Sequence, residues 1–139
     1  MKKRRWTVAA VAVMLLFTGC SFGTLKEQKT GEIEYEIVKK EEIHEKLKEE
    51  IAEAEKSEMW ISYADTGNEG RYLYIVRGYG RQETTGYSIE VNECYETEHT
   101  VVVRTTLLGP QKKEKTHKKK TYPYIVIKIP YTDKQIIYE

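Results

Sequence analysis

The chain has 139 residues, with 23 lysines and arginines against 22 aspartates and glutamates, so its formal net charge is +1. This length suits one compact domain that buries a real core. The balanced charge argues against a nucleic-acid-binding protein, which would carry a marked excess of basic residues.

The first twenty residues have the pattern of a secretory signal. A basic run at 2–5 precedes an apolar run from Trp6 to Phe17, and Thr18-Gly19-Cys20 follows. The twelve residues of the apolar run fall short of the roughly 20 that span a bilayer as a helix. The Thr-Gly-Cys ending resembles the lipobox of bacterial lipoproteins, in which the cysteine receives a diacylglycerol. The sequence therefore predicts a signal peptide at 1–19, a lipidated Cys20, and a protein anchored on the extracytoplasmic face of the cell membrane.

Removal of residues 1–19 would change the charge and the thiol content of the mature protein. Four basic residues leave with the signal, so 19 basic side chains remain against 22 acidic ones, a formal net charge of −3. With Cys20 lipidated, Cys94 is the remaining thiol, and an internal disulfide is excluded. We predict a tether at 20–31 and a single β-rich domain at 32–139.

The domain begins with one expected strand and one expected helix. From Glu32 to Val38 the residues alternate between acidic and apolar, which predicts a half-buried strand. From Lys39 to Ser57 the apolar residues follow helical spacing on an otherwise charged segment. We expect this helix to lie with its narrow apolar stripe against a sheet.

The rest of the chain has the pattern of strands joined by turns. The expected strands are Met59–Ala64, Arg71–Arg77, Tyr87–Tyr95, Thr100–Leu108, Tyr122–Ile129 and Lys134–Tyr138. Short connections and period-two patterning favour antiparallel pairing. The predicted fold class is therefore α+β, mainly antiparallel β, as a twisted sheet or small β-sandwich with one N-terminal amphipathic helix.

Two long loops are the candidate binding segments, because binding residues tend to lie on long loops between rigid strands. The first, 78–86, contains three glycines, two threonines and Tyr79, and Tyr87 follows it directly. Such a combination of hydroxyl and aromatic residues is typical of protein-binding surfaces. The second, 109–121, contains six lysines and one glutamate. The candidate partner-binding residues are Tyr79, Arg81, Thr84, Thr85, Gly86, Tyr87, Lys112, Lys113, Lys118 and Lys119.

Catalytic and metal-binding motifs are incomplete in this sequence. Gly78-Tyr79-Gly80 starts like a dinucleotide fingerprint, but Glu83 occupies the third glycine position. His44-Glu45 starts like a zinc-protease helix, but Lys48 stands where the second histidine belongs. No neighbour in the sequence would activate Cys94 as a nucleophile. We predict a protein that is not an enzyme and has no metal, no cofactor and no small-molecule substrate.

Three stretches resemble the signatures of the PrcB C-terminal domain family. They are Tyr72–Gly80, Thr84–Val91 and Thr121–Lys128, and the Leu107-Leu108-Gly109-Pro110 segment between them fits as well. Members of this family are often small exported lipoproteins, and the family is named for a subunit of a surface protease complex. The resemblance implies a non-catalytic accessory subunit that binds a partner protein, with an exported protease as the candidate partner.

Two alternative functions remain open. Thr84-Thr85-Gly86-Tyr87 resembles the Asn-Pro-Thr-Thr-Gly-Tyr loop of chagasin-like cysteine protease inhibitors, with Gln82-Glu83 in place of Asn-Pro. That resemblance implies a protease inhibitor. The lysines of 109–121 would alternatively bind an anionic lipid or a cell-wall polymer.

Overall fold

The structure is a computed structural model that describes residues 27–67 and 70–139. The predicted signal peptide and Cys20 lie outside the described residues. The elements in chain order are β1 (Gly31–Glu32), β2 (Glu36–Ile37), a 3₁₀ helix (Lys40–Glu42), α1 (Glu45–Ala54), β3 (Glu58–Asp65), β4 (Tyr72–Tyr79), β5 (Ser88–Glu96), β6 (Thr100–Leu108), β7 (Tyr124–Pro130) and β8 (Gln135–Tyr138).

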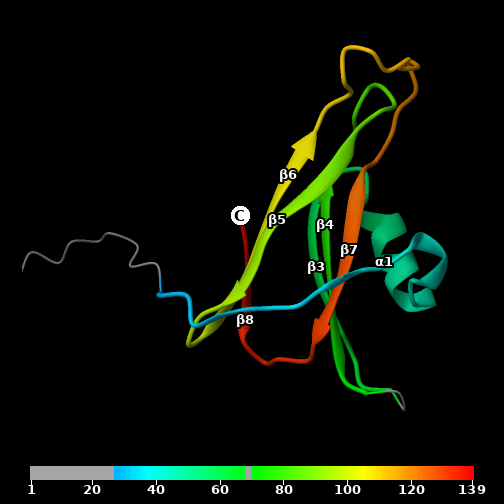
Figure 1. The fold of residues 1–139 in the computed structure, drawn as a ribbon. Coiled ribbons are helices and arrows are strands. Elements are labelled where there is room, and N and C mark those ends of the chain that lie inside the picture. The colour runs from blue at the N-terminus through cyan, green and yellow to red at the C-terminus, as the bar shows by residue number, and fades with distance from the viewer. Residues whose placement is uncertain (1–26, 68–69) are drawn as a thin grey trace, which may run out of the picture.

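Two four-stranded sheets form a small sandwich, with α1 on the outer face of one of them (Figure 1). The strand order is β1-β5-β6-β8 in sheet A and β2-β7-β4-β3 in sheet B. Five of the pairings between these strands are antiparallel, and β6–β8 is parallel. The predicted class, α+β and mainly antiparallel with one helix, is confirmed.

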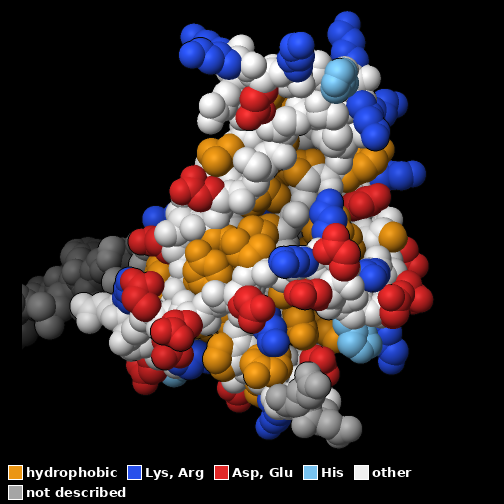
Figure 2. Space-filling model, turned by 45° about the vertical axis from the view of Figure 1, so that its right-hand side comes forward, with side chains coloured by type: hydrophobic (Ala, Val, Ile, Leu, Met, Phe, Trp, Pro, Cys, Tyr) orange, Lys and Arg blue, Asp and Glu red, His pale blue; other side chains and the backbone are white. Residues whose placement is uncertain are grey.

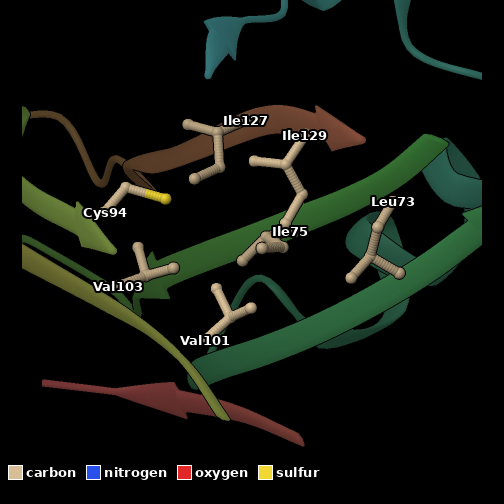
Figure 3. Close-up of a cluster of buried hydrophobic side chains, with 7 residues drawn as sticks. All are labelled: Leu73, Ile75, Cys94, Val101, Val103, Ile127 and Ile129. Atoms are coloured by element: carbon tan, nitrogen blue, oxygen red, sulfur yellow. The ribbon is translucent and has the colours of Figure 1, made fainter. Parts of the chain in front are cut away.

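The space between the two sheets holds the first of two apolar clusters (Figure 3). Leu73, Ile75, Ile127 and Ile129 reach in from sheet B, and Cys94, Val101 and Val103 reach in from sheet A. Each of these side chains is at most 6% exposed. Because alternate residues of a strand point to the same face of its sheet, Leu73 and Ile75 of β4 share the inner face of sheet B with Ile127 and Ile129 of β7.

The second cluster joins α1 to the outer face of sheet B. Leu47 and Ile51 from the helix, and Ile43 just before it, pack with Met59, Val76 and Val126 of the sheet. The apolar stripe predicted for this segment therefore has the expected partner. The helix is shorter than the predicted range Lys39–Ser57, because Ile43 has an extended backbone that separates the 3₁₀ turn from α1.

The prediction of a single half-buried strand over Glu32–Val38 is wrong. The segment forms two separate two-residue strands, and β1 pairs with β5 of sheet A while β2 pairs with β7 of sheet B. Crossing from one sheet to the other breaks the alternation of buried and exposed side chains. Ile33 packs on the cluster between the sheets, whereas Ile37 is 57% exposed.

The segment before β1 is fastened to the turn between β5 and β6. The Glu27 carboxylate accepts hydrogen bonds from the Thr97 hydroxyl and from the His99 backbone N–H, the latter at 3.2 Å. The hydrogen bond from Thr97 is the main cause of a lowered pKa at Glu27. Thr30 N donates to Glu96 O at 2.8 Å. The packed part of the chain therefore starts within the predicted tether 20–31.

Tyr138 links the two sheets and should make the fold sensitive to alkaline pH. Its hydroxyl donates to Ile61 O at 3.1 Å, and burial raises the pKa of Tyr138 to about 12 from its ordinary value of 10. The pKa of Tyr138 is higher in the folded protein than in the unfolded chain. The neutral, buried hydroxyl therefore contributes fully to the stability of the fold below pH 10, and its contribution declines as the pH rises toward 12. Between pH 9 and pH 11, we expect the free energy of unfolding to fall about 1 kcal/mol further in the wild type than in Tyr138→Phe. Urea unfolding of both proteins at the two pH values measures this difference, and parallel pH dependences would contradict the prediction.

Candidate functional site

The two loops predicted to bind a partner lie at the same end of the sandwich, at the top of Figure 1. We call residues 80–87 and 109–123 the loop end; they connect β4 to β5 and β6 to β7. The two loops pair through an isolated antiparallel bridge. In that bridge Gln82 N donates to Thr121 O at 2.8 Å, and Thr121 N donates to Gln82 O at 2.9 Å. The fold thus joins two segments that are separated in sequence into one surface.

Further hydrogen bonds hold the first loop against the lysine-rich loop. Thr85 N donates to His117 O at 3.1 Å, and His117 N donates to the Thr85 hydroxyl oxygen at 3.0 Å. The Thr121 hydroxyl donates to Thr84 O at 2.8 Å. Thr84 and Thr85 are half buried as a result. Their polar groups are therefore used largely to shape the loop end.

Two glycines of the first loop have the left-handed backbone conformation that favours glycine. Their φ angles are +72° at Gly80 and +97° at Gly86. A Cβ atom at Gly86 would also lie 2.8 Å from the Pro110 Cβ atom and 3.2 Å from a carboxylate oxygen of Glu114. Gly86 is therefore required both by its own backbone and by the close approach of the other loop.

The predicted contact residues differ in how they are presented. Tyr79 is half buried at the end of β4, where its hydroxyl lies 2.6 Å from the Thr105 hydroxyl oxygen. The Arg77 guanidinium lies 4.0 Å from the centre of the Tyr79 ring. Tyr87 is half buried too, whereas Arg81 is exposed and forms a surface ion pair with Glu83 at 3.2 Å. Of these residues, Arg81 is the one best placed to meet a partner.

The lysines give the loop end a strong local charge. Lys112, Lys113, Lys118 and Lys119 are exposed, as are Lys115 and Lys120. Glu114 is the single acidic residue of the same loop. Figure 2 shows basic side chains gathered at this end of the molecule. Within residues 27–67 and 70–139, no ion pair involves these six lysines.

The described residues show neither an activated cysteine nor a metal-binding cluster. Cys94 is 2% exposed in the core, and burial raises its thiol pKa to about 11, so the thiol is protonated at neutral pH. No group of His, Cys, Asp and Glu in the described part of the chain is arranged to hold a metal ion. None of the helices in that part is long and apolar enough to span a membrane.

Sequence reasoning overlooked an exposed aromatic site on β3. Trp60 is 49% exposed, and the Arg77 guanidinium lies 4.6 Å from its ring centre. An open groove of about 460 Å³ runs beside it between β3 and β8. Trp60 alternates along the strand with the more buried Met59 and Ile61. That alternation is visible in the sequence, but it does not show which face of the strand would be covered.

Residues 73–130 match the family model described as PrcB C-terminal. This segment of the chain is therefore similar to the PrcB C-terminal family. The family recognised from the three sequence stretches is thus confirmed. The PrcB C-terminal segment runs from β4 to the end of β7, so it includes both loops of the loop end. The comparisons with curated proteins and with solved structures gave no match.

Proposed function

We propose that this protein is a membrane-anchored, extracytoplasmic accessory subunit that binds a partner protein through its loop end and has no catalytic activity of its own. The observation that carries the proposal is the joining of the two loops by hydrogen bonds between residues 82–85 and 117–121. A surface that is already ordered loses little conformational entropy when a partner binds. The match to the PrcB C-terminal family supports a role within a protease complex.

The position of Glu27 supports a particular orientation on the membrane. Glu27 is bonded to the β5–β6 turn, and the loop end lies at the opposite end of these strands. Nine residues of β5 correspond to about 30 Å. In an upright protein anchored at Cys20, the loop end would therefore be directed away from the bilayer, toward a partner. Direct contact of the lysines with the anchoring membrane is less favoured by this geometry.

The inhibitor alternative gains no support from the described loop. An inhibitory loop must insert into a protease cleft, but the Thr84 carbonyl and the N–H and hydroxyl oxygen of Thr85 are hydrogen-bonded to the neighbouring loop. A partner that binds to the outer surface of the joined loops would not require these hydrogen bonds to break.

Site-specific photo-crosslinking in an exporting bacterium tests the proposal. A photoreactive amino acid at Arg81 or at Lys118 should crosslink the full chain to one exported protein, with a protease as the expected identity. The same amino acid at Ala52, on the exposed side of α1, is the matched control and should not capture that protein. Absence of a crosslinked protein from both loop positions, or equal capture from Ala52, would count against the proposed surface.

The anchor is tested in the same cells. The full chain should fractionate with membranes and carry a lipid at Cys20, and Cys20→Ser should release it or leave the signal uncleaved. Mass spectrometry of the mature amino terminus distinguishes these states. An unmodified, uncleaved wild-type chain in the cytosol would contradict the anchoring.

A further inference from the structure

In the described part of the chain, four strands form the edges of the two sheets, and β3 is the longest of them. Sheet A ends in β1 and β8, and sheet B ends in β2 and β3. The strands β1 and β2 have two residues each, β8 has four, and β3 has eight. An edge strand exposes backbone N–H and C=O groups with which another strand can pair, and shortness limits this pairing. Of these four, β3 therefore has the greatest capacity to accept a further strand.

The hydrogen bonds of β4 show which backbone groups of β3 point outward. Tyr79 N donates to Pro123 O, so the odd-numbered residues of β4 bond toward β7 and the even-numbered ones bond toward β3. The even-numbered residues are opposite Met59, Ile61, Tyr63 and Asp65. The alternate residues Trp60, Ser62 and Ala64 consequently direct their N–H and C=O groups away from β4.

The same three residues place their side chains along the groove between β3 and β8. Trp60, Ser62 and Ala64 are all exposed. The centre of β3, residues 59–64, contains no charged residue and no proline, which are two common protections of an edge strand. A long edge with an uncharged centre and an exposed indole is the type of surface on which another strand is expected to dock.

We propose that the occupant of this edge is a second copy of the same chain, paired antiparallel along β3 with Ser62 opposite the partner's Ser62. In this register every outward-facing backbone group of Trp60, Ser62 and Ala64 gains a partner. Both sheets B then form one continuous eight-stranded sheet about a twofold axis, which is the commonest symmetry of protein dimers.

Side-chain sizes favour this register on the groove face. Trp60 is opposite the partner's Ala64, so the largest side chain of the strand meets the smallest, and the symmetry repeats this pair. Ala64 lines the groove of about 460 Å³, so the incoming indole would lie against this open part of the surface.

The side chains on the other face of β3, away from the groove, are also compatible with this register. Ile61 is opposite the partner's Tyr63, and a branched residue facing an aromatic one is a favourable cross-strand pair. Asp65 is opposite the partner's Met59, so no like charges meet directly across the axis.

Cysteine substitution tests the register in the full chain carrying Cys20→Ser, purified in mild detergent. Directly opposed residues of a hydrogen-bonded antiparallel pair have Cα atoms about 5.5 Å apart, within the range that a disulfide bridges. Ser62→Cys should therefore give a covalent dimer under mild oxidation. Ala64→Cys is the matched control, because the two copies of residue 64 would be about 13 Å apart. The native Cys94 is buried in the core and should not react.

Charge substitution tests the twofold axis independently. Ser62→Lys or Ser62→Glu should weaken the dimer at least tenfold when each variant is alone, because like charges then face one another. Mixing the two variants should restore a dimer, as light scattering would show. Circular dichroism verifies that these exposed substitutions leave the fold intact.

The proposal is overturned if the wild-type chain is monomeric at about 100 µM. That result would also be expected if β3 paired only with a different protein. It is overturned equally if Ala64→Cys crosslinks as well as Ser62→Cys, or if both charged variants remain dimeric when alone.

Discussion

Replacing Leu47 with alanine is expected to lower the free energy of unfolding by about 2–5 kcal/mol. Leu47 is fully buried at the centre of the contact between α1 and sheet B. Truncation removes apolar contacts and leaves a cavity between two elements that are joined mainly by this cluster. Urea unfolding followed by circular dichroism measures the change.

The matched control for Leu47→Ala lies on the same helix. Lys46 is exposed, and its replacement by alanine should change the free energy of unfolding by less than about 0.5 kcal/mol. If Leu47→Ala were as mild as Lys46→Ala, the packing of α1 on sheet B would not contribute to stability as described.

The second large effect is expected at Gly86. Gly86→Ala forces a side chain into a left-handed conformation, which costs about 1–2 kcal/mol, and overlap with Pro110 adds about 1–3 kcal/mol. The two loops should then separate, and the Thr85 N–H, bonded to His117 O, should exchange faster with solvent. Hydrogen exchange at Thr85 measures this loosening directly.

Gly109→Ala provides the comparison, since Gly109 lies in the facing loop and has no positive φ. A Cβ atom there would lie 3.8 Å from the nearest atom of the Tyr87 ring, an ordinary contact. We expect normal exchange at Thr85 in Gly109→Ala and, in the crosslinking experiment, normal capture of the partner. Equal exchange rates in the two variants would show that Gly86 does not hold the loops together.

The strands and the helix were largely predictable because their signals are local. Branched and aromatic residues are concentrated in β4, β6 and β7, which predicts strands. The spacing of Ile43, Leu47 and Ile51 predicts a helix, and each of these signals lies within one short stretch of the chain. The segment 32–38 was mispredicted because its alternation is compatible with one strand in one sheet. Only pairing partners far away in the chain, β5 and β7, decide that it divides between two sheets.

The candidate site was predictable in its parts but not in its assembly. The glycine-rich and lysine-rich loops were visible as compositions, and Gly86 does have the backbone that glycine favours. The bridge between Gln82 and Thr121 depends on how β4 and β7 pair. The packing of one sheet on the other brings Tyr79 of β4 to Thr105 of β6, whereas Arg81 remains exposed.

By itself, the sequence determined the fold class, the family and the two loops, because periodicity, turn residues and short motifs are written within contiguous stretches. The tertiary structure alone decided which loops meet, which tyrosine hydroxyls are hydrogen-bonded within the domain and which strand lies at the edge of a sheet. These features arise from contacts between residues distant in sequence. A pattern within one strand cannot specify which other strand lies beside it, or whether any does.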